Sequence, residues 1–199
     1  MGEIVALEPL ILFAVAVTFT PGPNVIMVTA SAANFGFRRA IPQMLGITLG
    51  FGFMVAVAGL GLAGLLHAAP RWHTGLKYAG ATYLVYLAWR IARAEAGSTA
   101  PARARPIGFL EGALFTWVNP KAWVSSLGAV AAYTTVGGDV VQETALIAAV
   151  LAAACLISVA IWAAFGAAIG QFLASPRARA VFNWSMGGLL VLSLAPVFW

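Results

Sequence analysis

The sequence predicts an all-α integral membrane protein with six transmembrane helices, arranged as two inverted three-helix repeats in which helices one and four are broken. The composition is the first reason, because 62% of the 199 residues are hydrophobic and 9% are charged. Long charge-free stretches are the second, and prolines that interrupt two of them at matching places are the third. A soluble domain has about 25% charged residues. The composition therefore excludes soluble enzymes, nucleic-acid binders and disordered chains.

The spans follow from the intervals between charged side chains. A helix that crosses a bilayer needs about 20 predominantly apolar residues, and several charge-free intervals reach or exceed that length. The interval after Lys77 is shorter, so we expect its helix to include Arg90, whose side chain reaches the membrane surface. The expected spans are residues 5–32, 40–66, 75–93, 107–133, 142–170 and 179–198.

Basic residues between the spans predict the orientation. Six spans place both termini on one side, and the loops then alternate between the two sides. One side carries Arg38, Arg39, Arg90, Arg93, Arg103, Arg105, Arg177 and Arg179. The other carries Arg71 and Lys77, together with Glu3, Glu8, Asp139 and Glu143. Because cytoplasmic loops are rich in Lys and Arg, we expect both termini on the non-cytoplasmic side of the membrane.

A polar linker divides the chain into two halves. Residues 94–106 separate a first three-helix repeat, residues 1–93, from a second one, residues 107–199. An odd number of helices in each half makes the halves enter the membrane from opposite sides. This inverted topology is typical of secondary transporters.

Each half begins with a helix that is interrupted near its middle. The first break holds Thr20, Pro21, Gly22, Pro23 and Asn24, and the second holds Asn119, Pro120 and Lys121. Proline removes a backbone donor and clashes with the preceding turn, so each helix should kink or break here. A single break of this kind is usually an ordinary proline kink. Two breaks in corresponding places of two halves point instead to a transporter binding site.

The residues of the two breaks predict an anion site. Each half-helix that starts at a proline presents free N–H groups and the positive end of its dipole. Two such ends that converge at the membrane midplane suit a carboxylate. Lys121 adds a full positive charge, and an ionised group at membrane depth is costly unless it has a partner or a water cavity. The expected substrate-binding residues are Pro21, Gly22, Pro23, Asn24, Asn119, Pro120 and Lys121.

Other polar residues are candidates for the pathway. Glu111 lies one turn inside helix four, where it either carries protons or lines the cytoplasmic vestibule; a carboxylate that merely favours a helix N-terminus is the alternative. Thr20, Gln43 and Thr116 are candidates for lining the pathway, although Ser and Thr usually bond their own helix. The sequence predicts neither a metal site nor a cofactor. Its one cysteine, Cys155, excludes a disulfide within the chain and a redox pair.

The motifs resemble those of a known family. The stretch FTPGPNVIMVTASAANFGFRRAIPQMLGITLGFG is similar to the amino-terminal signature of the lysine exporter / homoserine–threonine resistance (LysE/RhtB) family. LKYAGATYLVYLAWRIARA and GFLEGALFTWVNPKAWVSSLGAVAAY resemble its third and fourth helices. The resemblance implies export of amino acids or close derivatives from the bacterial cytoplasm by secondary transport coupled to protons. It also implies a multi-pass location in the inner membrane.

The leading hypothesis is therefore an amino-acid exporter whose midplane site holds a substrate carboxylate. A strongly cationic substrate would need a second intramembrane acid, and Glu111 alone is available, which favours neutral amino acids. The alternative is a channel or permease for small ions, including divalent metals, but the spans lack the ligand clusters that metals need. Helix faces with glycines four residues apart permit close contact. Either packing within the bundle or a homodimer would use them.

Overall fold

The computed structural model consists of helices and their connections in the part of the chain that it describes. The described residues are 7–62, 82, 85, 86, 88, 89, 92, 93, 105–135, 138–173 and 175–192. The expected third span, residues 75–93, lies almost wholly outside them, as does most of the linker 94–106.

The first expected span is two helices that meet at an angle. Helix α1 (Leu7–Phe19) ends before the proline pair, and α2 (Pro23–Phe35) begins with the second proline at its first position. The two axes are bent by 56°. Proline at the first helical position is favourable, because its fixed backbone angle suits a helix start and its missing N–H would be unpaired there. The interruption expected in the first helix is present.

Helix α3 (Phe37–Val57) follows α2 after one residue, and the short π-helical segment η1 (Ala58–Leu62) extends it. The linking residue is Gly36, with φ 86° and ψ 159°. A residue with a side chain rarely adopts a positive φ, whereas glycine adopts it without a steric penalty. This glycine therefore lets the chain reverse direction between α2 and α3.

The fourth expected span is interrupted as well. Helix α6 (Phe109–Val118) and helix α7 (Pro120–Tyr133) are separated by Asn119, which has an extended backbone (φ −82°, ψ 111°). Pro120 occupies the first position of α7. The same physical device, a proline that starts a new helix, thus produces both breaks.

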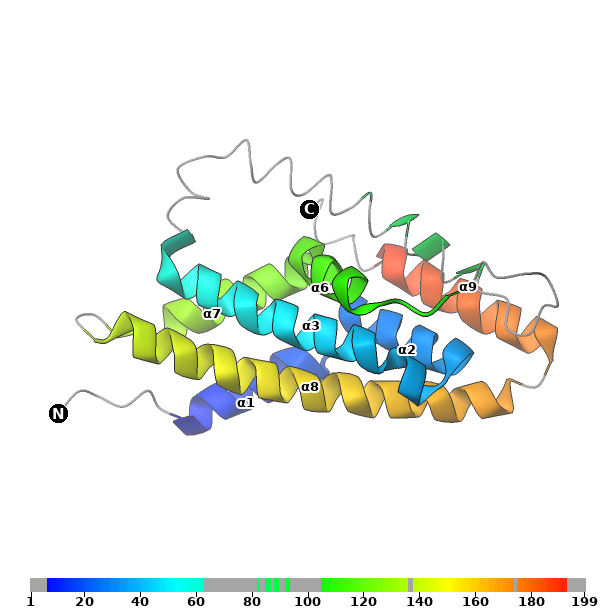
Figure 1. The fold of residues 1–199 in the computed structure, drawn as a ribbon, viewed down its shortest axis with the longest axis horizontal. Helices are drawn as coiled ribbons and strands as arrows, with labels where there is room; N and C mark the ends of the chain where they lie inside the picture. Colours follow the sequence, from blue (N-terminus) through cyan, green and yellow to red (C-terminus); the bar gives the residue numbers. More distant parts are fainter. Residues whose placement is uncertain are drawn as a thin grey trace.

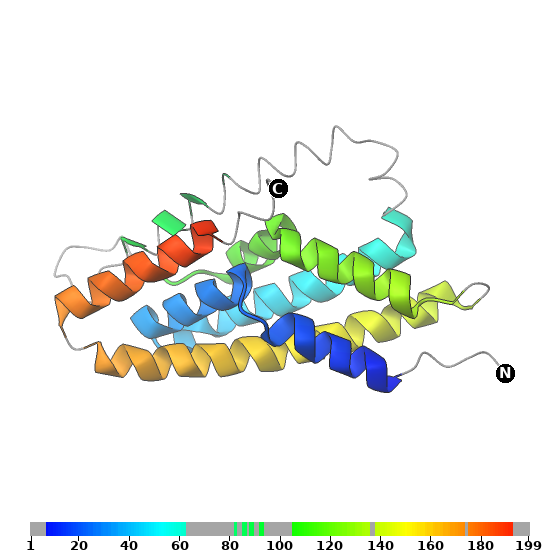
Figure 2. The same cartoon turned by 180° about the vertical axis from the view of Figure 1, so that it is seen from behind.

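Helix α8 (Val140–Phe172) is the longest described helix, and α1, α2 and α3 pack against it. It runs along the length of the molecule beside α1, α2 and α3 (Figures 1 and 2). Its first turn is fixed by Asp139, whose carboxylate accepts from the N–H groups of Val141 and Gln142 at 3.1 Å. Such an N-cap stabilises a helix by about 1 kcal/mol.

Helix α9 (Pro176–Leu192) is fastened to the end of α2 by polar contacts. The amides of Asn34 and Asn183 bond each other reciprocally, at 2.6 and 3.2 Å. Arg179 donates to the carbonyl of Ala33 at 3.4 Å and to that of Leu173 at 3.1 Å. These are carbonyls at the C-terminal ends of α2 and α8, where a cation is favoured by the helix dipole.

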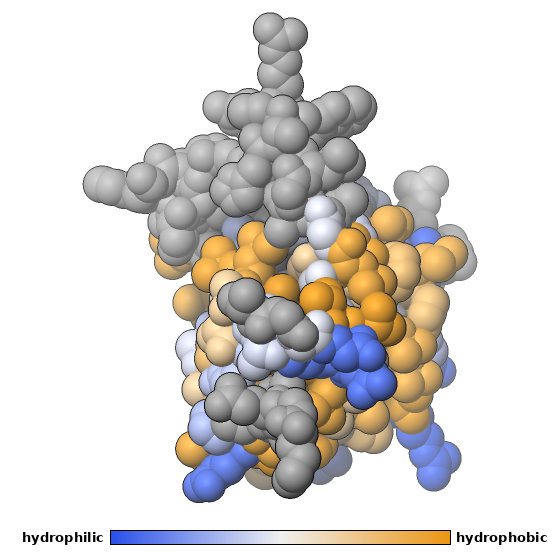
Figure 3. Space-filling view, turned by 90° about the vertical axis from the view of Figure 1, so that its left-hand side faces the viewer, coloured by the Kyte–Doolittle hydropathy of each residue, from blue (hydrophilic) through white to orange (hydrophobic). Residues whose placement is uncertain are grey.

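The described helices agree with a membrane protein, and they do not establish six spans. Two of them, residues 37–61 and 140–172, are long and apolar enough to cross a bilayer, and the bent pair α1–α2 would make a third. Helix α6 is apolar but shorter. Figure 3 shows large apolar areas on the visible flanks of the described part. A six-span inverted repeat remains a prediction.

Glycines allow the helices to approach closely within the bundle. A Cβ on Gly46 would lie 2.0 Å from the carbonyl oxygen of Phe109 on α6. On α8, Cβ atoms at Gly166 and Gly170 would lie 2.3 Å from the carbonyl oxygens of Thr29 and Ala33 on α2. The sequence left open whether such glycines serve packing within the bundle or a homodimer. In the structure these glycines make contacts inside one chain.

We predict that Gly166→Ala destabilises the protein. The new methyl group meets backbone rather than a flexible side chain, so α2 and α8 must separate, and overpacking of this kind costs about 1–3 kcal/mol. Thermal unfolding of the purified protein in detergent measures the effect. Gly188→Ala is the matched control, because a Cβ there meets nothing within 4 Å. Equal melting temperatures for the two variants would contradict the assigned contact.

Candidate functional site

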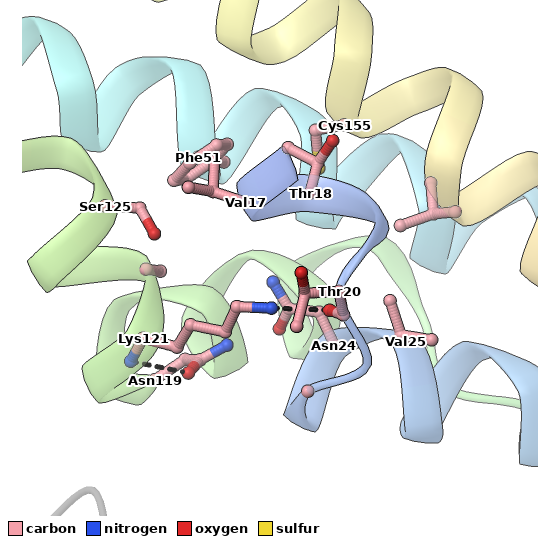
Figure 4. Close-up of a pocket in the computed structure, with 13 residues that line it drawn as sticks. Val17, Thr18, Thr20, Asn24, Val25, Phe51, Asn119, Lys121, Ser125 and Cys155 are labelled. Carbon is pink, nitrogen blue, oxygen red and sulfur yellow. Dashed lines mark hydrogen bonds between the residues drawn. The ribbon is translucent and has the colours of Figure 1, made fainter. Parts of the chain in front are cut away.

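The two breaks meet in one pocket. It receives residues from α1, α2, α3, α7 and α8 as well as from both breaks (Figure 4). The described residues that line it are Val17, Thr18, Thr20, Gly22, Asn24, Val25, Phe51, Asn119, Lys121, Ala122, Ser125, Cys155 and Val159. Segments about a hundred residues apart in the sequence therefore share one cavity.

Lys121 crosses from the second break to the first. Its ammonium group donates to the carbonyl oxygen of Thr20, as the dashed line in Figure 4 shows. The side chain passes directly over Gly22, where a Cβ would lie 2.9 Å from its Cδ and 3.3 Å from its Nζ. Gly22 has extended backbone angles that any residue adopts (φ −165°). Its lack of a side chain matters here because it leaves room for Lys121.

The C-terminal end of α1 receives donors from two other helices. The hydroxyl of Ser158 on α8 donates to the carbonyl oxygen of Thr18 at 2.8 Å. The ammonium group of Lys121 on α7 donates to the carbonyl oxygen of Thr20. The last carbonyls of a helix have no partner within it and form the negative end of its dipole. The lysine therefore sits where a positive charge is favourable.

The second break satisfies its own backbone. The side chain of Asn119 accepts from the N–H of Lys121 at 3.1 Å, and its carbonyl accepts from that of Ala122 at 3.1 Å. On the other side of the break, the indole of Trp123 donates to the carbonyl of Trp117 at 2.7 Å. The N-terminus of α7 is thus capped by its own asparagine.

The N-terminus of α2 is different. Its N-cap is Gly22, which has no side chain to accept a hydrogen bond. The backbone N–H groups of Asn24 and Val25 have no hydrogen-bond partner among the described residues, and both residues line the pocket. The sequence led us to expect two equivalent positive helix ends. The structure instead leaves one open and closes the other, because the asparagine side chain accepts a hydrogen bond from the helix start and glycine has no side chain to do so.

Asn24 connects the pocket to α6. Its side-chain N–H donates to the hydroxyl of Thr116 at 3.4 Å, and Thr116 in turn donates to the carbonyl of Gly112 at 3.1 Å. The side-chain oxygen of Asn24 is buried and has no partner in the described part of the chain. An acceptor is therefore available at the pocket for a ligand donor.

The structure brings together five of the residues that the sequence singled out: Thr20, Gly22, Asn24, Asn119 and Lys121. Pro21, Pro23 and Pro120 do not line the pocket; Pro23 and Pro120 start α2 and α7. Thr116 stands behind Asn24.

Gln43 and Glu111 lie away from the pocket. Gln43 is fully buried on α3, and Glu111 is in the first turn of α6. The Glu111 carboxylate accepts from the N–H of Gly108 at 2.9 Å and pairs with Arg105 at 3.3 Å. These contacts are those of a carboxylate at a helix N-terminus, the alternative that the sequence had left open, and they do not test a role in proton transfer.

Several lining residues had no signal in the sequence. Phe51 and Cys155 come from α3 and α8, whose own sequences show only apolar spans. Ser125 is one helical turn after Lys121, so it shares the face of α7 that holds the lysine. That spacing identifies Ser125 once Lys121 is taken as a site residue. Thr18 bonds its own helix, at 2.7 Å to Ala14, as threonine usually does.

The charge of the pocket is positive. Lys121 is the one charged side chain among its described lining residues, and none of those residues is a carboxylate. Across the described ranges of the chain, no group of three or more His, Cys, Asp or Glu residues is arranged to hold a metal ion. The pocket can therefore attract an organic anion or the anionic end of a zwitterion.

Comparison with known families agrees with this arrangement. The model of the LysE type translocator family matches residues 15–198. The chain belongs to this family. It is accordingly a membrane transporter and not an enzyme, and the resemblance read from the proline motifs is confirmed.

Curated relatives come from other bacteria. A cysteine/O-acetylserine efflux protein of Klebsiella pneumoniae is 28% identical over 176 residues, which cover 86% of each chain. An uncharacterised membrane protein of Pseudomonas aeruginosa is 36% identical over 121 residues, or 56% of each chain. A cysteine/O-acetylserine efflux protein of Escherichia coli K12 is 36% identical over 103 residues, so the match spans about half of that relative. No solved structure matches this chain significantly.

Gly22→Ala should weaken transport by displacing Lys121. A methyl group 2.9 Å from the lysine Cδ requires that side chain to shift from its position over Gly22. Since a hydrogen bond to a charged group is worth about 1.5–3 kcal/mol and the shift weakens it only in part, we expect the KM for the transported solute to rise by up to about tenfold. Uptake or efflux kinetics in membrane vesicles measure this.

The matched control is Gly128→Ala, a glycine of α7 whose Cβ would make an ordinary contact 4.0 Å from Phe13. It should transport as wild type does. A wild-type KM in Gly22→Ala would show that the position of Lys121 over this glycine has no part in binding.

Proposed function

We propose that this translocator is a secondary active exporter of amino acids or close derivatives from the bacterial cytoplasm. One observation supports this most directly: the open N-terminus of α2 and the ammonium group of Lys121 face the same pocket. Free N–H groups at a helix start and a nearby cation form a site for a carboxylate. Discontinuous helices serve the same purpose at the midplane of other secondary transporters.

The pocket also offers acceptors for the amino group of a zwitterion. The side-chain oxygen of Asn24 is unpartnered in the described structure, and the carbonyl of Thr20 accepts from Lys121. When a substrate carboxylate draws Lys121 toward the α2 N-terminus, the Thr20 carbonyl becomes free to accept. The substrate ammonium then lies between Thr20 and Asn24, with its carboxylate at Lys121.

Neutral amino acids with small side chains fit this site best. A cationic side chain would need a carboxylate, which the described lining residues do not supply. The remaining surface is mostly apolar, from Val17, Phe51 and Val159, with the polar atoms of Ser125 and Cys155. The Klebsiella relative is named for efflux of cysteine and O-acetylserine, which are amino acids of this kind.

The matched breaks support an inverted repeat in this chain. We propose six transmembrane helices, three in residues 1–93 and three in residues 107–199, joined by a cytoplasmic linker over 94–106. Both halves then begin with a helix broken at a proline, as α1–α2 and α6–α7 are. The arginine-rich loops favour both termini on the non-cytoplasmic side.

Protons are the proposed coupling ion, and Glu111 is the proposed carboxylate of the cytoplasmic vestibule. It is partly exposed at the start of α6, at the end of that helix remote from the pocket. The proposed partners are the amino-acid substrate, protons, the lipid bilayer and a second copy of the chain.

Efflux from preloaded cells tests the proposed function. Cells that express the wild-type protein should lose labelled O-acetylserine, cysteine or threonine faster than cells without it. Lys121→Ala should reduce this loss by about tenfold or more, since it removes a charge-assisted hydrogen bond to the carboxylate. Arg177→Ala, which removes an exposed cation elsewhere, should leave it unchanged. Equal loss of every amino acid from wild-type and empty cells would overturn the proposal.

Coupling is tested separately in inverted vesicles with an imposed proton gradient. Addition of a protonophore should abolish accumulation of the substrate above its external concentration. Glu111→Gln should reduce gradient-driven accumulation while substrate exchange without a gradient continues, because exchange requires binding but no net proton movement. Glu8→Gln, at an exposed carboxylate of α1, is the control. Full gradient-driven accumulation by Glu111→Gln would remove this residue from the coupling mechanism.

A further inference from the structure

Polar side chains that are wholly or partly buried lie on α2, α3 and α6, starting from Asn24 of the pocket. Asn24, Ser31, Gln43 and Thr116 contribute to this group, which we call the polar file. The side chains of Gln43 and Thr116 are fully buried, and Ser31 is 5% exposed. Within the described part of the chain, both amide atoms of Gln43, the hydroxyl of Ser31 and the side-chain oxygen of Asn24 have no hydrogen-bond partner.

The contacts of α2 show which way its polar residues face. Thr29 and Ala33 lie against α8, at Gly166 and Gly170. Asn24 and Ser31 are two helical turns apart, so they share a face, and that face points away from Thr29 by the helical period. Asn24 donates to Thr116, which places α6 opposite this face. Ser31 thus continues the direction of Asn24, about 10 Å further along α2 toward Gly36.

Gln43 lies on the side of α3 that packs against α6. A Cβ on Gly112 of α6 would lie 2.7 Å from the carbonyl oxygen of Gln43, so the backbones of α3 and α6 are in contact here. Gly112 precedes Thr116 by one turn of α6, or roughly 6 Å. The buried amide therefore belongs to the same interface as the Asn24–Thr116 hydrogen bond, deeper than the pocket.

An unpartnered amide in this position is unfavourable in a protein with a single conformation. A buried polar group without a hydrogen bond costs about 1–3 kcal/mol. The cost is understandable if another state of the protein hydrates these atoms or offers them a substrate. The glycine contacts of α3 with α6, at Gly46, Gly50 and Gly112, are the ones that would have to separate to admit water.

We infer that the polar file is the closed half of the translocation path, and that Gln43 lines it when α3 and α6 part. The inference rests on the proposed function and extends it from the pocket to a route. The file runs from the pocket toward the α2–α3 turn, where Arg38 and Arg39 are exposed and where the sequence predicts the cytoplasmic side. Glu111, at the start of α6, is near the same end.

A matched pair of substitutions separates a path residue from a packing residue. Gln43→Leu removes the amide and keeps the approximate size; Thr144→Val removes another buried, unpartnered hydroxyl, on α8. Because the amide makes no hydrogen bond in this state, Gln43→Leu should unfold at the same temperature as wild type or higher. It should nevertheless export about tenfold more slowly, and Thr144→Val should export normally.

Cysteine labelling gives a second readout that does not depend on transport rate. In inverted vesicles, Gln43→Cys should react with a small cationic thiol reagent applied from the cytoplasmic face. The wild-type protein, with buried Cys155 alone, provides the background. Saturating substrate should change the labelling rate of Gln43→Cys, because it shifts the population of the two states.

The outcomes distinguish this inference from the proposed function. Normal export by Gln43→Leu, or a Gln43→Cys thiol that is no more reactive than the background, overturns the inference and leaves amino-acid export intact. Reactive Gln43→Cys in a protein that exports no amino acid supports the path and overturns the assigned substrate. If Gln43→Leu fails to fold, the labelling of Gln43→Cys alone decides.

Discussion

The arrangement of this protein depends on backbone groups that two broken helices leave without helical partners. In hydrocarbon each unsatisfied group costs several kcal/mol, so a break persists only where protein, water or ligand supplies partners. Four side chains supply them here. Ser158 and Lys121 donate to the end of α1, and Asn119 and Trp123 satisfy the two sides of the second break. The packing of α8 and α7 against α1 follows from this need.

The N-terminus of α2 keeps backbone N–H groups without a hydrogen-bond partner among the described residues, and we expect the substrate to bind there. The side chain of Asn119 caps α7, whereas Gly22 has no side chain with which to cap α2. The free N–H groups of α2 therefore face a pocket that also holds a lysine. The ammonium group of the lysine lies at the C-terminal end of α1. A carboxylate at α2 competes for it, so binding alters a contact that joins α7 to α1. Binding of the transported solute can thereby change the contact between the first and second halves of the chain.

Close packing of glycines covers the polar file that we infer to be the closed half of the path. Backbone contacts at Gly46 and Gly112 hold α3 against α6, and Gly166 holds α2 against α8. Both interfaces lack side chains at the point of contact, so small displacements separate them without unpacking large residues. The polar file lies under the first interface. A sealed interface that covers unpartnered polar atoms is what alternating access requires of the closed half of a path.

The sequence alone determined the membrane class, the two proline breaks and the residue set Thr20, Gly22, Asn24, Asn119 and Lys121, because composition and proline chemistry act locally. It also predicted the family. It could not show that Lys121 reaches Thr20, that Gly22 makes room for it, or that α2 and α7 differ in their caps. Nor could it place Phe51 and Cys155 in the pocket. These facts depend on which helices are neighbours, and that is decided by the long-range packing of glycine faces rather than by any local pattern.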